Sequence, residues 1–419
     1  MRRAAWLLSI LLAGPLTAQE PAASGDDLTV SLLTMGPGEA IWERFGHNAI
    51  RVTDRGTGSD ITYNFGMFDF RQERFVLRFA QGRMHYWMEG HRAEREVAAY
   101  ARANRSVWEQ ALNLTGPQKL ALRDFLEWNA REENKFYRYD YYRDNCSTRV
   151  RDAIDSVLAG AIRRHTATSP AGTTYRFHTR RLTENGPLMY SAINTGLGPA
   201  TDRPISQWEE MFLPLAMREH LRTVSVPAPG GGMQPLVRSE RTLFTSTALD
   251  PPSVPPRWWP VYLAAGVLLG TLLVLSAEQL GGSGLARWAF GIVGGGWSLL
   301  AGVSGVVLAG LWLATDHEAA YANQNLLQLS PLSLPLAVLL PRLASAQGTP
   351  GRWTMQLASG VALLAMAGML WKVLPLTQQV NGEIIALALP LQLAVGLAVC
   401  RSGVRQRFQP IDPGRTHTV

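Results

Sequence analysis

Apolar and polar residues are distributed unevenly along the 419 residues of this chain. Up to about residue 257, short alternating runs are mixed with charged segments, which is typical of strands and amphipathic helices in a soluble domain. From Trp258 on, the chain is largely Leu, Ala, Val and Gly, with apolar stretches at 258–277, 289–314, 326–344, 354–374 and 383–400. Each approaches the ~20 residues that a helix needs to cross ~30 Å of hydrocarbon.

These stretches predict an all-α membrane domain at 258–400 with about five transmembrane helices, and three or four spans are the alternative. The third stretch is the least regular, because Pro331, Pro335 and Pro341 interrupt it. The polar segment TDHEAAYANQNLL separates the second and third stretches. It is either a solvated loop or a polar surface that faces the soluble domain or lipid headgroups.

Two patterns in the soluble half predict a β-hairpin. HNAIRV begins at His47, DITYNFGMFDF begins at Asp60, and both are rich in strand-forming residues. The turn-rich segment DRGTGSD lies between them, so we expect two antiparallel strands with His47 on one and Asn64 on the other. Helices are predicted at 114–136 and directly after Asn145, which makes the soluble half an α+β domain.

The helix after Asn145 is predicted by its spacing. Val150, Ile154 and Leu158 recur at the interval of one helical face, and Asp144 or Asn145 is a suitable N-cap. Cys146 then occupies the first turn. The unpaired backbone N–H groups and the positive end of the helix dipole are expected to favour a thiolate there.

The ends of the chain predict where it is located. Residues 1–18, MRRAAWLLSILLAGPLTA, combine two arginines, a short apolar run and small residues, which predicts a signal peptide; an uncleaved anchor is the alternative. The Pro- and Gly-rich segment 224–257 is predicted to be loop and linker. Arginines gather near alternate membrane loops, so we expect the soluble domain outside and the basic tail, 401–419, in the cytoplasm.

The net charge of +7 does not indicate a nucleic-acid partner, because no basic stripe is interleaved with aromatic residues. We find no CxxC, HExxH, Walker or dinucleotide-binding motif. No metal, nucleotide or other cofactor is therefore expected.

The chain holds only two cysteines, Cys146 and Cys400. On the predicted topology a membrane separates them, so they cannot form a disulfide within one chain. Cys146 is therefore a candidate reactive thiol or an intermolecular linker, with an inert buried cysteine as the alternative. Its polar neighbours argue against burial. His47 is the first candidate for a base, followed by His85, and Asn64 could hold the imidazole in one tautomer.

Four blocks in this order, FGHNAIRV, YNFGMFDF, YRYDYYRDNCSTRVRDAI and LGPATDRPISQWEEMFLP, resemble the Lnb-type periplasmic domain. The resemblance covers about residues 28–223 and extends more weakly into TDHEAAYANQNLLQLSPL. That domain is similar to circularly permuted papain-like (NlpC/P60-like) thiol enzymes, in which the histidine precedes the cysteine. The resemblance implies a periplasmic domain with an antiparallel sheet and helices, held at the bacterial inner membrane by the bundle.

The resemblance also implies the activity of a lipoprotein N-acyltransferase. Such an enzyme moves a fatty acyl chain from a membrane lipid, through a cysteine thioester, to the N-terminal amine of a diacylglyceryl lipoprotein. Carried over to this sequence, Cys146 matches the nucleophile and His47 the base. The role of Asn64 as the orienting residue is inferred from the predicted hairpin.

Two further roles are predicted around the thiol. The backbone N–H of Cys146 is expected to stabilise the oxyanion, with Asn145 or Tyr139 as the second donor. The alternatives are plain helix capping for Asn145 and aromatic packing for Tyr139. Two other functions are kept open for the whole chain: a membrane-anchored NlpC/P60-like peptidoglycan endopeptidase or amidase, and a non-catalytic membrane scaffold.

Overall fold

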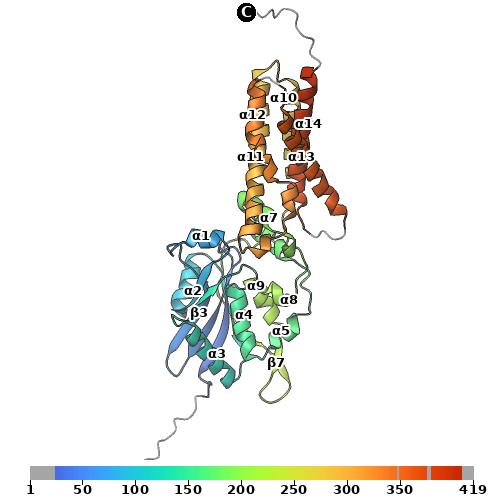
Figure 1. Ribbon diagram of the computed structural model, residues 1–419. Helices are drawn as coiled ribbons and strands as arrows, with labels where there is room; N and C mark the ends of the chain where they lie inside the picture. Colours follow the sequence, from blue (N-terminus) through green and yellow to red (C-terminus); the bar gives the residue numbers. More distant parts are fainter. Residues whose placement is uncertain (1–23, 347–348, 375–378, 408–419) are drawn as a thin grey trace, which may run out of the picture.

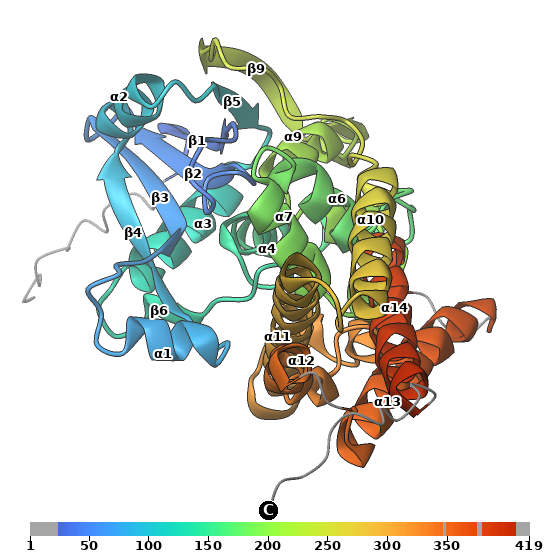
Figure 2. The same ribbon diagram turned by 90° about the horizontal axis from the view of Figure 1, so that it is seen from above.

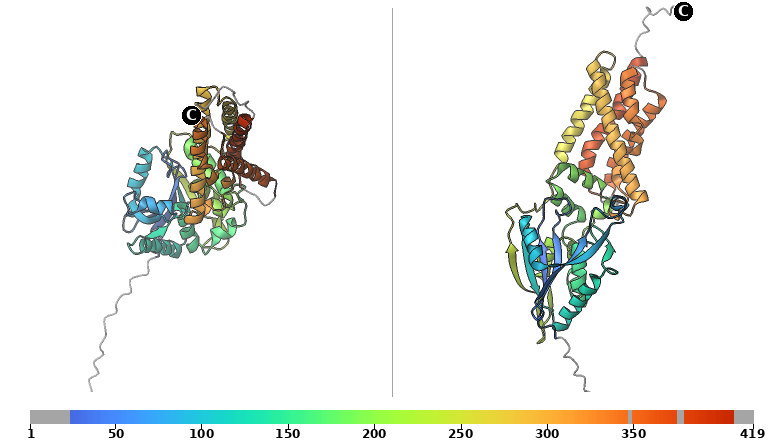
Figure 3. Two further views of the ribbon diagram at one scale, coloured as in Figure 1. Left: turned by 45° about the horizontal axis from the view of Figure 1, so that its top comes forward. Right: turned by 90° about the vertical axis from the view of Figure 1, so that its left-hand side faces the viewer.

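The computed structural model describes residues 24–346, 349–374 and 379–407. An α+β domain occupies one end of the molecule and a helical bundle the other (Figures 1 and 3). The predicted signal peptide, 1–18, and the end of the basic tail lie outside the described residues. The strands are β1 Leu28–Met35, β2 His47–Asp54, β3 Ser59–Met67, β4 His85–Arg92, β5 Val107–Leu112, β6 Phe136–Arg138, β7 Ser225–Pro227, β8 Met233–Pro235 and β9 Val237–Phe244.

The helices of the α+β domain are α1 Phe75–Ala80, α2 Ala93–Arg102, α3 Gly116–Asn129, α4 Cys146–Val157, α5 Ala161–Thr166, α6 Tyr175–Thr183, α7 Pro187–Gly196, α8 Gln207–Glu210 and α9 Pro214–Leu221. Those of the bundle are α10 Trp259–Glu278, α11 Gly284–Ala314, α12 Leu336–Ala346, α13 Arg352–Leu370 and α14 Gly382–Arg407. The α+β class predicted for the chain, with a helical region after it, is thus confirmed.

The domain is built on a seven-stranded antiparallel sheet with the order β6-β4-β3-β2-β1-β5-β9. The predicted hairpin is confirmed, because β2 pairs with β3 in a register that sets Ala49 opposite Asn64. Side chains alternate between the two faces of the sheet. Leu32 and Ile50 belong to the larger core, which also contains residues of α3 and α4. Leu33 points to the opposite face of the sheet and belongs to a second cluster, against which residues of α2 pack.

One domain boundary differs from the prediction. The segment 224–257 was expected to be loop and linker, but β7 and β8 pair with each other and β9 pairs with β5 as the last strand of the main sheet. β9, VRSERTLF, is mostly polar because an edge strand is half solvated, so its composition resembled that of a loop. The domain therefore extends to Phe244, and the linker is shorter than predicted.

Among the described residues, the bundle has four helices long and apolar enough to cross a membrane, and up to five spans if a bent pair of helices is counted as one span. The bent pair, 324–333 followed by 336–345, turns by 48°. This stretch contains three prolines. Because proline lacks a backbone N–H, it kinks or interrupts an α-helix. The irregular third stretch is confirmed within the described residues, whose four or five candidate spans include both the predicted number of about five and the alternative of four.

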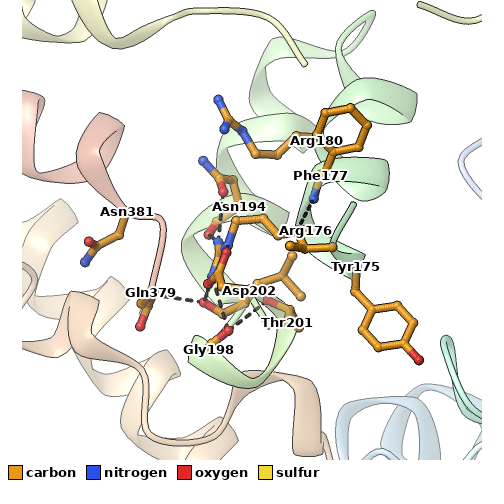
Figure 4. A network of polar contacts seen from close by, with 12 residues as sticks. Tyr175, Arg176, Phe177, Arg180, Asn194, Gly198, Thr201, Asp202, Gln379 and Asn381 are labelled. Carbon is orange, nitrogen blue, oxygen red and sulfur yellow. Dashed lines mark hydrogen bonds and ion pairs between the residues drawn. The ribbon is translucent and has the colours of Figure 1, made fainter. Parts of the chain in front are cut away.

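The polar segment between the second and third spans faces the soluble domain. The Asp316 carboxylate pairs with Arg83, and the Asn323 amide donates to the carbonyls of Thr195 and Gly196 at 2.9 Å. The same junction contains a buried polar network in which Gln379, just before α14, donates to the Leu197 carbonyl (Figure 4). These contacts join the two domains by hydrogen bonds rather than by the linker alone.

Candidate active site

Cys146 is the first residue of α4, and the side chain of Asn145 caps this helix as predicted. The Asn145 carbonyl oxygen Oδ1 accepts from the backbone N–H groups of Ser147 and Thr148 at 2.9 Å. Its amide nitrogen Nδ2 donates to the Tyr141 and Phe212 carbonyls, at 2.9 and 3.0 Å. Both amide hydrogens are thus used inside the protein. The geometry matches the capping alternative for Asn145 and leaves it no hydrogen to offer a substrate.

The Cys146 sulfur lies among backbone N–H groups, namely its own and those of Asn48 and Ser147. Gly66 of β3 packs directly against it: with a φ of +89°, a Cβ at this position would lie 3.2 Å from the Cys146 Cβ. Burial raises the pKa of the thiol to about 11, although the N–H groups and the nearby Arg105 act in the opposite direction. The expected thiolate is therefore not favoured at rest, because desolvation outweighs the helix terminus.

His47 begins β2, and its ring nitrogen Nε2 lies 3.0 Å from the Asn64 oxygen Oδ1. The amide of Asn64 is oriented by its other contacts, since Nδ2 donates to the Thr62 carbonyl and to the Glu96 carboxylate. An acceptor oxygen therefore faces the ring, so Nε2 carries the proton and Nδ1 is left as the basic nitrogen. Burial lowers the pKa of His47 to about 4, which keeps the imidazole neutral at neutral pH.

The predicted base begins β2, which packs against α4, the helix that begins with the predicted nucleophile. Asn48, directly after His47, points its backbone N–H at the Cys146 sulfur, and its side chain hydrogen-bonds the Ser147 hydroxyl at 2.9 Å. Within the described chain no hydrogen bond joins the His47 ring to the sulfur. Such catalytic hydrogen bonds often tighten only in the substrate complex.

Two family models match the chain, one for each half. The Lnb N-terminal periplasmic domain matches residues 18–184, and the Lnb transmembrane domain matches residues 261–404. The chain belongs to the Lnb family. It has the family's two parts in order, a periplasmic domain and a multi-pass membrane domain. No curated protein and no solved structure gives a significant match.

The Lnb periplasmic match contains Cys146, His47 and Asn64, and it also contains residues that the sequence did not single out. Glu96 of α2 holds the Asn64 amide at 3.1 Å and the ring of His91 at 3.0 Å. No local motif marks Glu96, because only the pairing of β3 and β4 and the start of α2 bring it near. The hydrogen bond to the Glu96 carboxylate fixes the Asn64 amide in the orientation in which its oxygen faces the His47 ring.

Two phenols lie beside the thiol of the Lnb domain. The Tyr139 ring, predicted as a donor, packs on Tyr86 with ring centroids 4.4 Å apart. The Tyr137 hydroxyl is buried and, among the described residues, has no hydrogen-bond partner. Burial, and next the charge of Cys146, raise the pKa of both phenols, so both are neutral donors. Of the two, Tyr137 is the phenol whose hydroxyl is fully buried without a hydrogen-bond partner among the described residues.

The candidate site faces the membrane half. Tyr141, five residues before Cys146, stacks on His317 at 6.0 Å, and Arg143 forms an ion pair with Glu318. Both partners follow the end of α11 directly. In the described residues no group of three or more His, Cys, Asp or Glu side chains could hold a metal. The chemistry is therefore derived from the thiol, the imidazole and the surrounding N–H groups.

Proposed function

We propose that this Lnb-family protein is a thiol-dependent lipoprotein N-acyltransferase. The observation that carries the proposal is a thiol at the start of α4 beside the backbone N–H of Asn48, with the amide-oriented imidazole of His47 one residue before Asn48, at the membrane end of the periplasmic domain. A nucleophile and base held in this way suit acyl transfer through a covalent intermediate. The permuted papain-like relationship is part of the proposal, since His47 precedes Cys146 in the chain.

The first half-reaction acylates the thiol. Nδ1 of His47 takes the Cys146 proton as the sulfur attacks the ester carbonyl of a membrane lipid. The tetrahedral oxyanion is stabilised by the backbone N–H groups of Cys146 and Asn48, with the free Tyr137 hydroxyl as a third donor. The C–O bond then breaks, His47 returns the proton to the leaving alkoxide, and a lysolipid departs from the Cys146 thioester.

The second half-reaction moves the acyl group to nitrogen. The N-terminal amine of a diacylglyceryl lipoprotein attacks the thioester carbonyl while the neutral His47 ring takes a proton from it. The C–S bond breaks, an amide forms, and the proton returns to the sulfur. A ring whose pKa is lowered to about 4 by burial is ready to act as a base in both halves.

A peptidoglycan endopeptidase or amidase would use the same pair on a peptide carbonyl. The position of the site favours the lipid substrates, because both of them are anchored in the bilayer that the bundle crosses. A soluble cell-wall fragment could bind equally well at a site far from the membrane. We also propose that the C-terminal tail is cytoplasmic, since Arg287, Arg352 and Arg401 lie at the bundle end far from the periplasmic domain.

The test is mass spectrometry of lipoproteins from cells that depend on this protein for N-acylation. Cys146→Ala is expected to leave them diacylated, and His47→Ala to slow transfer by about 10²–10⁴-fold. Cys400→Ala, at the other end of the bundle, is the matched control and is expected to retain full activity. Triacylated lipoproteins at the normal level in Cys146→Ala cells would overturn the proposal. Cleavage of peptidoglycan by the purified protein would favour the endopeptidase.

A further inference from the structure

α1 and two loop residues, Phe70, which contacts Phe75 of α1, and Trp42, which contacts Phe70, present an apolar surface to solvent. Within the described residues α1 buries none of its side chains. We call this surface the apolar lip; its residues and exposed fractions are Trp42 56%, Phe70 58%, Val76 77%, Leu77 51% and Phe79 44%. The rings of Trp42 and Phe70 are in contact, with centroids 5.5 Å apart. Contiguous apolar patches of this kind mark contact with a partner or a membrane.

α1 lies at the level where the bundle begins (Figure 1), and seen from above it lies to one side of the bundle helices (Figure 2). Its position is set by hydrogen bonds to the segment after α11: the Asp316 N–H donates to the Gln81 carbonyl at 2.8 Å, and the His317 ring bonds the Phe79 carbonyl at 2.9 Å. α11 ends only two residues earlier, and its last turn exposes Leu313 to 78%. Such a side chain on a membrane helix faces lipid, so the lip lies beside the bilayer surface.

The charge around the lip agrees with this position. Residues 69–83 hold four arginines against two carboxylates, an excess of two positive charges. A helix that lies in the membrane interface combines an apolar face with basic residues. The apolar face is buried at the boundary between headgroups and acyl chains, and the basic residues are attracted to anionic headgroups. α1, FVLRFA, has this composition together with Arg71, Arg74 and Arg83 on either side.

An aromatic path connects the lip to the thiol. Phe70 contacts Phe68 at 5.1 Å, and Phe68 stacks on Tyr86 at 5.0 Å. Tyr86 in turn packs on Tyr139, with ring centroids 4.4 Å apart. Phe68 also follows Gly66, which touches Cys146, by two residues. An apolar chain entering at the lip would therefore contact rings along its way to the sulfur.

We propose that the apolar lip inserts into the outer leaflet and guides the acyl chain of a membrane phospholipid to Cys146. The membrane position of the lip stands by itself, whereas the delivery of the acyl chain rests on the proposed acyl transfer. The experiments below separate the two.

The membrane position is tested with the full chain in vesicles of phosphatidylethanolamine and phosphatidylglycerol. In a Cys146→Ala, Cys400→Ser background, a single fluorophore is attached after Leu77→Cys or, as the matched control, after Trp128→Cys. Trp128 is similarly exposed, at 49%, but lies on α3 at the end of the domain away from the bundle. Phospholipids brominated on the acyl chain are expected to quench the label at 77 and not the one at 128. Equal quenching at both positions would overturn the insertion and leave the lip to a protein partner.

Delivery is tested by the rate at which Cys146 becomes acylated, followed by intact-protein mass spectrometry. The double variant Leu77→Asp, Phe79→Asp is expected to slow acylation from bilayer phospholipid about tenfold or more, since a charge at each position opposes insertion. Acylation by a water-soluble short-chain ester is expected to stay unchanged. The matched control Phe125→Asp, Trp128→Asp is expected to leave both rates unchanged.

The outcomes distinguish the two proposals. If the lip variant slows both donors equally, guidance of the acyl chain is wrong, because the lip then acts on the site and not on lipid access. If the unmodified protein is acylated by neither donor, the proposed acyl transfer is wrong, whereas the quenching experiment still decides where the lip lies.

Discussion

At the residue scale, the state of the Cys146–His47 pair is set by burial. A helix N-terminus contributes about 0.3–2 kcal/mol in favour of an anion. Here that contribution is outweighed, since burial raises the pKa of the thiol to about 11 and lowers that of the imidazole to about 4. Both groups are neutral at pH 7. The pair therefore differs from a preformed thiolate–imidazolium, and the proton must move as the sulfur attacks.

This resting state predicts a slow reaction with a simple alkylating reagent. A pKa raised from 9.0 to about 11 leaves about one hundredth of the thiolate of an unperturbed thiol at any pH well below 9. In a Cys400→Ser background, alkylation of Cys146 by iodoacetamide is expected to be slowed accordingly and to rise with pH beyond 9. His47→Ala is expected to change this profile little. A plateau of the rate near neutral pH would instead reveal an ion pair.

The same residues show how far sequence reasoning reaches. The hairpin predicted His47 and Asn64 as neighbours, because alternation and a turn are local signals. The cap of α4 placed Cys146 in the first turn for the same reason. Glu96, Asn48 and Tyr137 were missed, since their relation to the site depends on strand order and helix packing. The burial that sets both pKa values is likewise a tertiary property.

At the element scale, α6 and the turn after α7 are held by a buried ion pair. Arg176 and Asp202 pair at 2.7 Å with side chains that are almost fully buried, and Arg176 also donates to Asn194 and to the Leu197 and Gly198 carbonyls (Figure 4). Each guanidinium hydrogen-bonding direction is thus occupied. A buried charge with this many partners is stable only while its counter-ion is present.

Asp202→Ala is therefore expected to destabilise the periplasmic domain by about 3–5 kcal/mol, because it leaves the Arg176 charge buried without its partner. Thermal unfolding of the detergent-solubilised protein measures this. The neighbouring Arg203→Ala is the matched control; Arg203 pairs with Glu209 at the surface, where such a bond contributes about 0–1 kcal/mol. Similar unfolding temperatures for the two variants would show that the buried pair contributes no more than the exposed one.

The sequence predicted an element correctly where the apolar residues of that element form a long run or recur at a regular interval. The four long spans were predicted from apolar runs, and α3 was predicted within 114–136, although the helix ends at Asn129. β9 was missed because an edge strand with a polar outer face has no marked alternation. The broken third span could be predicted as irregular from its prolines, but the size of its 48° bend could not be predicted from them.

At the scale of the whole molecule, the junction between the domains contains polar groups that are unusual so close to a membrane bundle. Glu383, at the start of α14, is buried, and four groups donate to it: the Tyr190 hydroxyl at 2.8 Å, the Asn194 amide, the Arg180 guanidinium and the Trp258 N–H. Three of these donors belong to α6 or α7 of the periplasmic domain, and the fourth, Trp258, directly follows the linker. The carboxylate therefore fixes the periplasmic domain against the bundle, and with it the height of Cys146 above the bilayer.

Glu383→Ala is expected to loosen this junction. Four donors lose their acceptor, and the domain gains freedom to tilt about the 245–257 linker. We expect faster proteolytic cleavage of that linker, and acylation of Cys146 from bilayer phospholipid slowed by about tenfold, since misplacement of a site by ~1 Å can cost up to 10²-fold. Acylation by a water-soluble ester is expected to be kept. Glu278→Ala is the matched control, because Glu278 pairs with Arg401 at the far end of the bundle. If both variants behave like the unmodified protein, the linker and the remaining contacts hold the domain in place without Glu383.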